Sequence, residues 1–138
     1  MTSKKLIDML NKALSMELQA SIQYMQNHVM VYGIYSESIA GVFRKTGIEE
    51  MKHAESISER IDYVGGEPTT KPAPITLGKT AEQSLNLAVK AEEDAIAAYR
   101  DIVKAAEAEA DYTTRELIED ILAQEEDHHN TFTTLLQK

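Results

Sequence analysis

The chain has 138 residues, the length of one domain, and we expect a single domain over residues 1–138. It contains no cysteine, which excludes disulfides and cysteine-ligated metal sites, so any metal must be held by carboxylates and imidazoles. The net charge of −9 argues against nucleic acid and membrane as partners and favours cations. No apolar run is long enough to span a membrane, and the N-terminus lacks the apolar core of a signal peptide. We therefore expect a cytoplasmic protein.

Four long segments carry apolar residues at steps of three and four, which is the period of an amphipathic helix. Good helix formers dominate the composition, and there are only six glycines and three prolines. The first helix is predicted to begin after Thr2 or Ser3, either of which can cap it, and to end near Gly33. The second is predicted to begin at a serine cap, Ser36 or Ser38.

Residues 65–80 form the linker that the pattern predicts, because they contain three glycines and all three prolines, which interrupt a helix. The apolar side chains of Ile75 and Leu77 are expected to anchor this linker to the helices. A third helix is predicted to begin near Thr80. A break at residues 111–114, with a threonine cap, separates it from the fourth helix, which runs nearly to the end of the chain.

The lengths of the three connections predict the topology. The first and third connections are short, and short loops join helices that lie side by side and antiparallel. The middle linker is long enough to run the length of the bundle. We therefore predict an all-α fold, an antiparallel four-helix bundle made of two helical hairpins joined by one long crossover.

Charged side chains interrupt the inward-facing rows of all four predicted helices. A carboxylate buried alone costs on the order of several kcal/mol unless it is paired or bound to a metal, so interruptions at matching depth predict one shared polar site. Each of the first and third helices contributes one glutamate, and each of the second and fourth contributes a Glu-x-x-His motif. The predicted metal ligands are Glu17, Glu50, His53, Glu93, Glu126 and His129.

The spacing of these residues repeats in the two halves of the chain. The step from Glu17 to Glu50 equals the step from Glu93 to Glu126, and one constant offset relates all three ligands of the first half to those of the second. Residues i and i+3 share a helix face, so each Glu-x-x-His can present both groups to one ion. Acidic residues are abundant here, and Glu92 is the alternative to Glu93. Four carboxylates and two imidazoles favour two iron ions per chain, or manganese, over soft metals.

The stretch EMKHA at residues 50–54 and the spacing of the six predicted ligands resemble bacterioferritin, a ferritin-like di-iron carboxylate protein. The resemblance implies a ferritin-like bundle in which Glu50 and Glu126 bridge the two irons and Glu17 and Glu93 are terminal ligands. It also implies ferroxidase activity, in which Fe(II) is oxidised by O2 or hydrogen peroxide for iron storage or detoxification. The expected assembly is a homo-oligomer, at least a dimer.

Two further positions gain interest from the resemblance. In the family, a tyrosine placed as Tyr24 lies close to the di-iron centre, where it can donate a hydrogen bond or one electron; a core tyrosine with a bonded hydroxyl is the alternative. Tyr99 has a similar but less supported claim. Met51 stands where bacterioferritins bind haem across a two-fold dimer interface, and plain packing is the alternative role of this side chain.

The sequence also departs from the family. It stops nine residues after His129, where bacterioferritins continue into a short fifth helix that makes contacts in the 24-subunit shell, so a shell and a smaller assembly both stay open. A peroxidase resembling the rubrerythrins, acting without a storage shell, is the alternative function. Those proteins usually carry a further glutamate where this chain has Ile96, and a cysteine-bound iron domain. A helical interaction module with a buried acidic network is a third reading, disfavoured by the cost of burying charge without metal.

Overall fold

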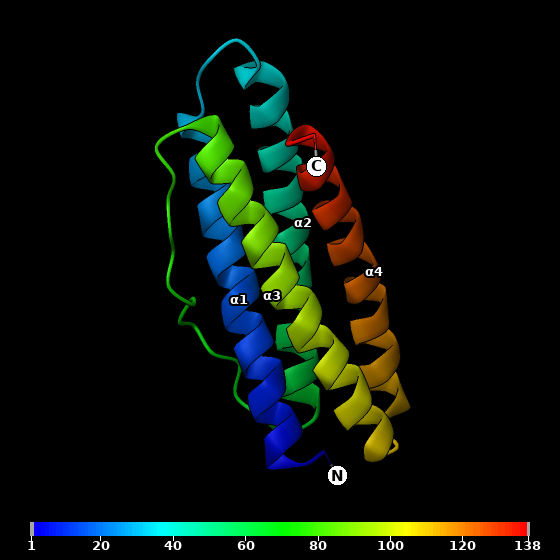
Figure 1. Cartoon of the computed structure of the whole chain (residues 1–138). Helices are drawn as coiled ribbons and strands as arrows, with labels where there is room; N and C mark the ends of the chain where they lie inside the picture. The colour runs from blue at the N-terminus through cyan, green and yellow to red at the C-terminus, as the bar shows by residue number, and fades with distance from the viewer. Residues whose placement is uncertain (1, 138) are drawn as a thin grey trace.

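The computed structural model describes residues 2–137, which form four helices: α1 (Lys4–Met30), α2 (Ser36–Tyr63), α3 (Ala81–Ala108) and α4 (Tyr112–Leu135). Figure 1 shows the four helices standing side by side, with the segment between α2 and α3 running back along the outside of the bundle. The predicted all-α bundle of two antiparallel hairpins joined by one crossover is confirmed. Within the described part of the chain, no helix is both long and apolar enough to cross a membrane.

The helices begin at caps that the sequence predicts only in part. The side chains of Ser3 and Thr80 each accept a hydrogen bond from the backbone N–H three residues on. Ser3 is one of the two predicted caps of α1, and α3 begins next to Thr80 as predicted. The predicted serine cap of α2 is wrong, because Tyr35 precedes this helix without a side-chain cap bond. The predicted threonine cap of α4 is also wrong: Asp111 caps it, and the backbone N–H of Thr114 donates to its carboxylate at 3.1 Å. A carboxylate is a strong acceptor at the positive end of a helix dipole.

Polar contacts with α1 hold the crossover in place. The amide of Asn11 donates to a crossover carbonyl at 3.0 Å and accepts from a crossover N–H at 2.8 Å. The backbone carbonyl of Ser15 accepts a further crossover N–H at 2.8 Å. The predicted anchors, Ile75 and Leu77, are both exposed, so that prediction is wrong. A proline-broken segment cannot pair its own backbone groups, and its neighbour supplies the partners.

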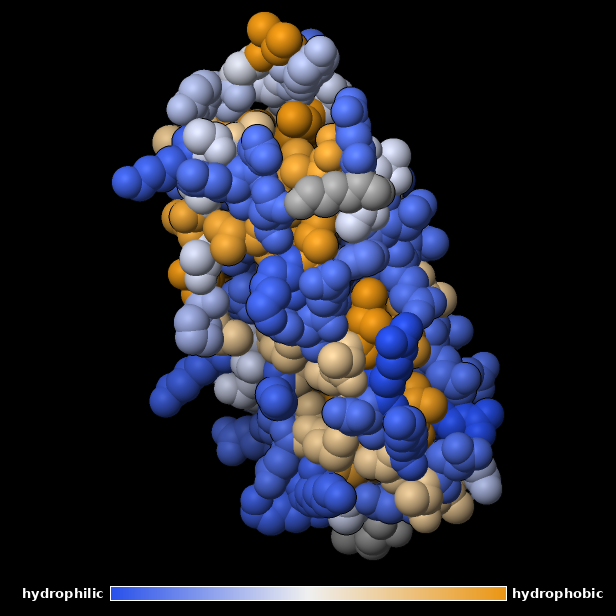
Figure 2. All heavy atoms as spheres, in the orientation of Figure 1, coloured by the Kyte–Doolittle hydropathy of each residue, from blue (hydrophilic) through white to orange (hydrophobic). Residues whose placement is uncertain are grey.

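The core consists of two apolar clusters stacked along the bundle axis. The larger contains Leu10 and Ile61 and lies toward the start of α1. The smaller surrounds the mutually packed rings of Tyr24, Phe43 and Phe132, whose centroids are 5.4–5.7 Å apart. Hydrophilic side chains cover most of the face seen in Figure 2. The interior between the two clusters is a layer of buried carboxylates and imidazoles.

Candidate metal centre

All four helices contribute to this buried polar layer. α1 supplies one glutamate, α3 supplies another, and α2 and α4 each supply a glutamate and a histidine three residues apart. None of the six residues is more than 5% exposed, and apolar clusters lie on both sides of them. The members of the layer are Glu17, Glu50, His53, Glu92, Glu125 and His128.

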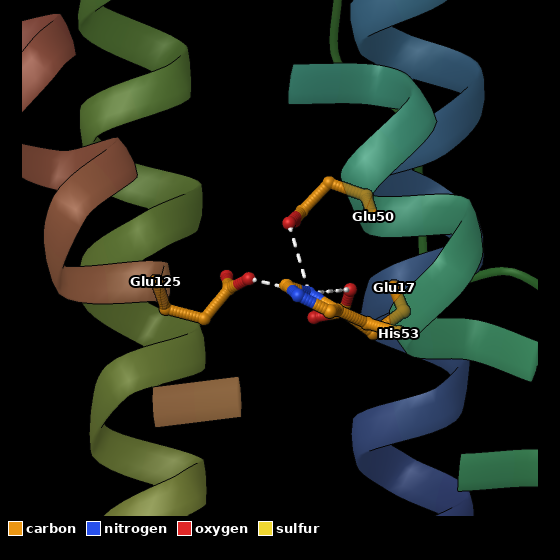
Figure 3. Close-up of side chains that lie close together, drawn as sticks. All are labelled: Glu17, Glu50, His53 and Glu125. Carbon is orange, nitrogen blue, oxygen red and sulfur yellow. Dashed lines mark hydrogen bonds and ion pairs between the residues drawn. The ribbon is translucent and has the colours of Figure 1, made fainter. Parts of the chain in front are cut away.

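Three carboxylates converge on the imidazole of His53 (Figure 3). Its Nδ1 atom lies 3.2 Å from Glu17 Oε2 and 3.3 Å from Glu50 Oε1. Glu125 approaches from the opposite side of the bundle, with Oε1 at 3.0 Å from the same nitrogen. The imidazole therefore occupies the centre of a group of three acids that come from three helices.

A second group forms around His128. Its Nδ1 atom lies 3.1 Å from Glu50 Oε1, 3.5 Å from Glu125 Oε1 and 3.6 Å from Glu92 Oε1. In each group, one potential ligand atom per residue lies within 4.8 Å of all the others. Glu50 and Glu125 belong to both groups. The geometry thus offers two adjacent metal positions, each with its own histidine and one unshared glutamate, and two carboxylates that can bridge them.

Burial controls the protonation of the layer. Burial raises the pKa of Glu17 well above its usual range, and the nearby carboxylates of Glu50 and Glu125 raise it further. Burial, with Glu125, also raises the pKa of Glu92 to about 8. Burial lowers the pKa of the His53 and His128 imidazoles, but the close carboxylates around them outweigh burial, so both pKa values are raised. Without metal, the layer therefore holds protons in positions that cations can take.

Several buried atoms of the layer lack a hydrogen-bond partner. Among the described residues these include Glu50 Oε1, Glu92 Oε2, both carboxylate oxygens of Glu125 and the Nδ1 atom of His128. Buried polar atoms without a partner are rare in folded proteins. Hard oxygen and imidazole nitrogen donors that converge in this way fit divalent iron or manganese.

Two buried tyrosines brace the unshared glutamates. The hydroxyl of Tyr24 donates to Glu92 Oε1 at 2.9 Å, and the hydroxyl of Tyr99 donates to Glu17 Oε1 at 2.6 Å. Each tyrosine lies seven residues after the glutamate of its own helix and bonds the glutamate of the other helix. The prediction that Tyr24 lies close to the site agrees with this geometry, and Tyr99 has an equivalent place.

Three of the predicted ligands lie on the surface instead. The side chains of Glu93, Glu126 and His129 are 56%, 51% and 32% exposed. His129 Nε2 lies 3.2 Å from Glu93 Oε2, and Arg100 donates to Glu126 at 3.1 Å. The prediction that these three line the bundle interior is therefore wrong. Glu92, the alternative to Glu93, lies in the layer.

The error is a shift of one residue, which rotates a side chain by about 100° around a helix. Each of the three has an identical neighbour one position earlier, so both choices keep the equal spacing of the glutamates and the Glu-x-x-His motif. The apolar row of α4 distinguishes them: Ile118 and Ile121 lead in steps of three and four to Glu125, His128 and Phe132, all buried. That row is the sequence signal that identifies the correct register.

The outer nitrogens of the two histidines contact two residues that were not predicted from the sequence. Nε2 of His53 lies 2.8 Å from the amide oxygen of Gln124, and Nε2 of His128 lies 2.5 Å from a carboxylate oxygen of Glu49. Their position in the sequence could have indicated them, because each directly precedes a glutamate that is shared by the two groups. These contacts fix both rings so that Nδ1 faces the carboxylates.

The outer face of α1 and α2 carries an apolar surface hollow of about 540 Å³. Its lining includes the exposed side chains of Ile22, Met25, Val29 and Met51. Met51 directly follows Glu50 on α2, yet it points to the outside of the bundle while Glu50 points inward. Met51 is therefore accessible to a group or a partner that covers this face.

Comparisons with known proteins agree with the fold. A family model described as "Ferritin-like domain" matches residues 7–138. Bacterioferritin from Desulfovibrio desulfuricans is 35% identical over 125 residues, which cover 90% of this chain and 70% of that protein. Bacterioferritin from Brucella melitensis is 32% identical over 133 residues, covering 96% and 83%. A crystal structure of a ferritin-like, diiron-carboxylate protein from Bacillus anthracis matches with a TM-score of 0.95 and 30% identity over 99% of each chain. The chain therefore belongs to the ferritin-like family, and its predicted resemblance to the bacterioferritins is confirmed.

Proposed function

We propose that this chain binds two iron ions in the buried layer and oxidises Fe(II) to Fe(III) with O2 or hydrogen peroxide, as a ferroxidase that serves iron storage or detoxification. The observation that carries the proposal is the pair of overlapping carboxylate–histidine groups, with unpartnered oxygens inside an apolar bundle. The bacterioferritin relatives and the diiron-carboxylate structure favour iron over manganese, which the same donor set would also hold.

The proposed ligand roles follow from the sharing of residues. Glu50 and Glu125, common to both groups, bridge the two ions. Glu17 and Glu92 are terminal ligands, and each ion takes one imidazole through Nδ1. Four carboxylates balance the four positive charges of two ferrous ions, as a buried ionic site requires. Each Fe(II) releases one electron, so two ions supply the pair that reduces O2 to hydrogen peroxide, or hydrogen peroxide to water, with two protons.

We assign Tyr24 and Tyr99 the role of holding the terminal carboxylates in place. Their hydroxyls donate to Glu92 and Glu17, so each fixes the orientation of a carboxylate that must serve both oxidation states. Tyr24, for which the family resemblance implies a place near the centre, is also proposed as an electron donor when a single Fe(II) is bound, so that this ion and the tyrosine together supply the two electrons that reduce hydrogen peroxide to water. A Tyr24→Phe variant that keeps full iron binding but loses oxidation rate would support that second role.

In α4, each proposed ligand is followed by an identical residue on the surface, and this neighbour is a matched control. His128→Ala and Glu125→Ala should lose rapid Fe(II) oxidation and bound iron, whereas His129→Ala and Glu126→Ala should keep both, since those side chains lie outside the layer. The measurements are the initial rate of ferric absorbance after anaerobic Fe(II) loading and iron counted per chain. Wild-type rates in His128→Ala would contradict the proposal. Mixing with O2 or with hydrogen peroxide in separate runs distinguishes a ferroxidase from a peroxidase.

We also propose that the chain assembles at least as a dimer through the apolar outer face of α1 and α2, and that Met51 there is placed to ligate a haem shared by two copies. The exposed thioether on an apolar hollow is the observation that fits such a group. Solution mass tests the assembly, and a Soret band that disappears in Met51→Ala tests the haem. A monomer without a Soret band would contradict both parts.

A further inference from the structure

The two histidines of the layer differ in what holds their outer nitrogens. The Nε2–H of His53 donates to the neutral amide oxygen of Gln124 at 2.8 Å. The Nε2–H of His128 donates to the carboxylate of Glu49 at 2.5 Å. In both cases Nδ1 points to the other side of the ring, toward the carboxylates of the proposed metal position.

This is a difference between two halves of the chain that otherwise contribute the same residue types to the layer. The two halves of the chain correspond by one constant offset, and each proposed ligand or brace has a partner of the same type. The matched pairs are Glu17 with Glu92, Tyr24 with Tyr99, Glu50 with Glu125, and His53 with His128. The same offset places Glu49 opposite Gln124, a carboxylate opposite an amide.

The group that accepts the Nε2–H hydrogen bond affects how strongly the imidazole binds a metal through Nδ1. A carboxylate that accepts the outer N–H of a metal-bound imidazole makes the imidazole a stronger electron donor and holds its orientation, and loss of such a partner typically lowers metal affinity about 10–100-fold. A neutral amide orients the ring but gives less of this effect, since hydrogen bonds to ionised acceptors are stronger. Glu49 is 31% exposed, so solvent screens its long-range field and the direct hydrogen bond carries the difference.

We propose that Glu49 and Gln124 are positioning residues that make the two metal positions unequal, so that the ion beside His128 binds first and is held more tightly than the ion beside His53. This inference rests on the proposed two-metal site. The ion beside His53 would exchange more readily than the ion beside His128, because it is held less tightly.

The test uses the metal-free full chain labelled with 15N-histidine and titrated with Zn(II), which does not change oxidation state. The ring nitrogen shifts of His53 and His128, assigned with single His→Ala variants, report which histidine binds at each equivalent. In the wild type, His128 should respond during the first equivalent and His53 during the second. Calorimetry should give two distinct affinities, with a ratio below the roughly 10–100-fold loss that removal of an outer partner causes.

Exchanging the two acceptors should reverse the order. Glu49→Gln should weaken the first step, Gln124→Glu should strengthen the second, and the double variant should make His53 respond first. Glu126→Gln, an equal change of charge on the surface of α4, should leave the order unchanged. Simultaneous responses at both histidines, or an order that the exchange does not alter, would overturn the inference while leaving the two-metal site intact. No Zn(II)-dependent shift at either histidine in the wild type would overturn the proposed function as well.

Discussion

At the scale of a single residue, Glu92 shows how protonation reduces the negative charge of the layer when no metal is bound. Its pKa is raised to about 8, chiefly by burial, so the folded state binds a proton that the unfolded state releases above the usual value of 4.5. The stability that this proton supplies is therefore present at low pH and is lost as the pH rises through about 8. The raised pKa values of His53 and His128 act in the same direction above 6.5.

We predict that the metal-free protein becomes less stable from pH 5 to pH 8, and that Glu92→Gln flattens part of this loss because glutamine needs no proton to be neutral. Urea unfolding in the presence of a chelator measures both profiles. The control is Glu93→Gln, which removes an equal charge from the adjacent, exposed position. Parallel profiles for the wild type and Glu92→Gln would contradict the assignment of Glu92 to the layer.

The hydrogen bonds of the two tyrosine hydroxyls lead to a second prediction for single residues, which concerns stability. Tyr99→Phe removes the donor to Glu17 while keeping the ring, and an unsatisfied buried acceptor typically costs about 1–3 kcal/mol. The free energy of unfolding of the metal-free protein should fall by about that amount. Tyr63→Phe, which changes an exposed hydroxyl, is the matched control and should have no measurable effect. Equal stabilities for the two variants would argue against the Tyr99 brace.

At the scale of the elements, Asp111 joins the two hairpins at one end of the bundle. It caps α4 and also accepts a hydrogen bond from Arg60 of α2 at 2.9 Å. Burial alone would raise its pKa, but the hydrogen bonds from Thr114 and the charge of Arg60 lower it overall. The stability that its charge contributes is therefore present at neutral pH and is lost in acid, as the pH falls through its lowered pKa.

We predict that Asp111→Ala lowers the free energy of unfolding by about 1–2 kcal/mol through loss of the cap. Asp111→Asn should lose less, because asparagine still accepts the cap hydrogen bond and only the charge is removed. Thermal melts at neutral pH compare the two, with the exposed Asp101→Ala as the reference surface change. Equal losses from Ala and Asn would mean that the ion pair, not the cap, dominates.

For the whole molecule, the proposed metals would connect all four helices through one layer. A ligand that binds only the folded state stabilises it by RT ln(1 + [L]/Kd), about 2.7 kcal/mol per site at a free concentration 100 times Kd. We predict that Mn(II), which avoids oxidation during the measurement, raises the Tm of the wild type but not of Glu125→Ala. Glu126→Ala should follow the wild type. An equal rise in Tm for Glu125→Ala would place the binding outside the layer.

The sequence by itself determined the number of helices, their pairing and the composition of the candidate site. Apolar periodicity, a proline-rich crossover and a Glu-x-x-His motif in each half are local features, and local features can be read along one chain. Glu17, Glu50 and His53 lie in the layer as predicted, because no identical neighbour of these residues keeps both the spacing and the motif.

The spacing of the glutamates and histidines left open which residue of each doublet in the second half faces inward, and the tertiary structure decided it. Repeated glutamates and histidines satisfy the same spacing in either register, and the choice depends on how α3 and α4 are rotated against the apolar clusters. The same is true of Glu49 and Gln124, whose contacts cross between α2 and α4. Such contacts depend on the packing of helices far apart in the sequence, which spacing along one helix does not specify.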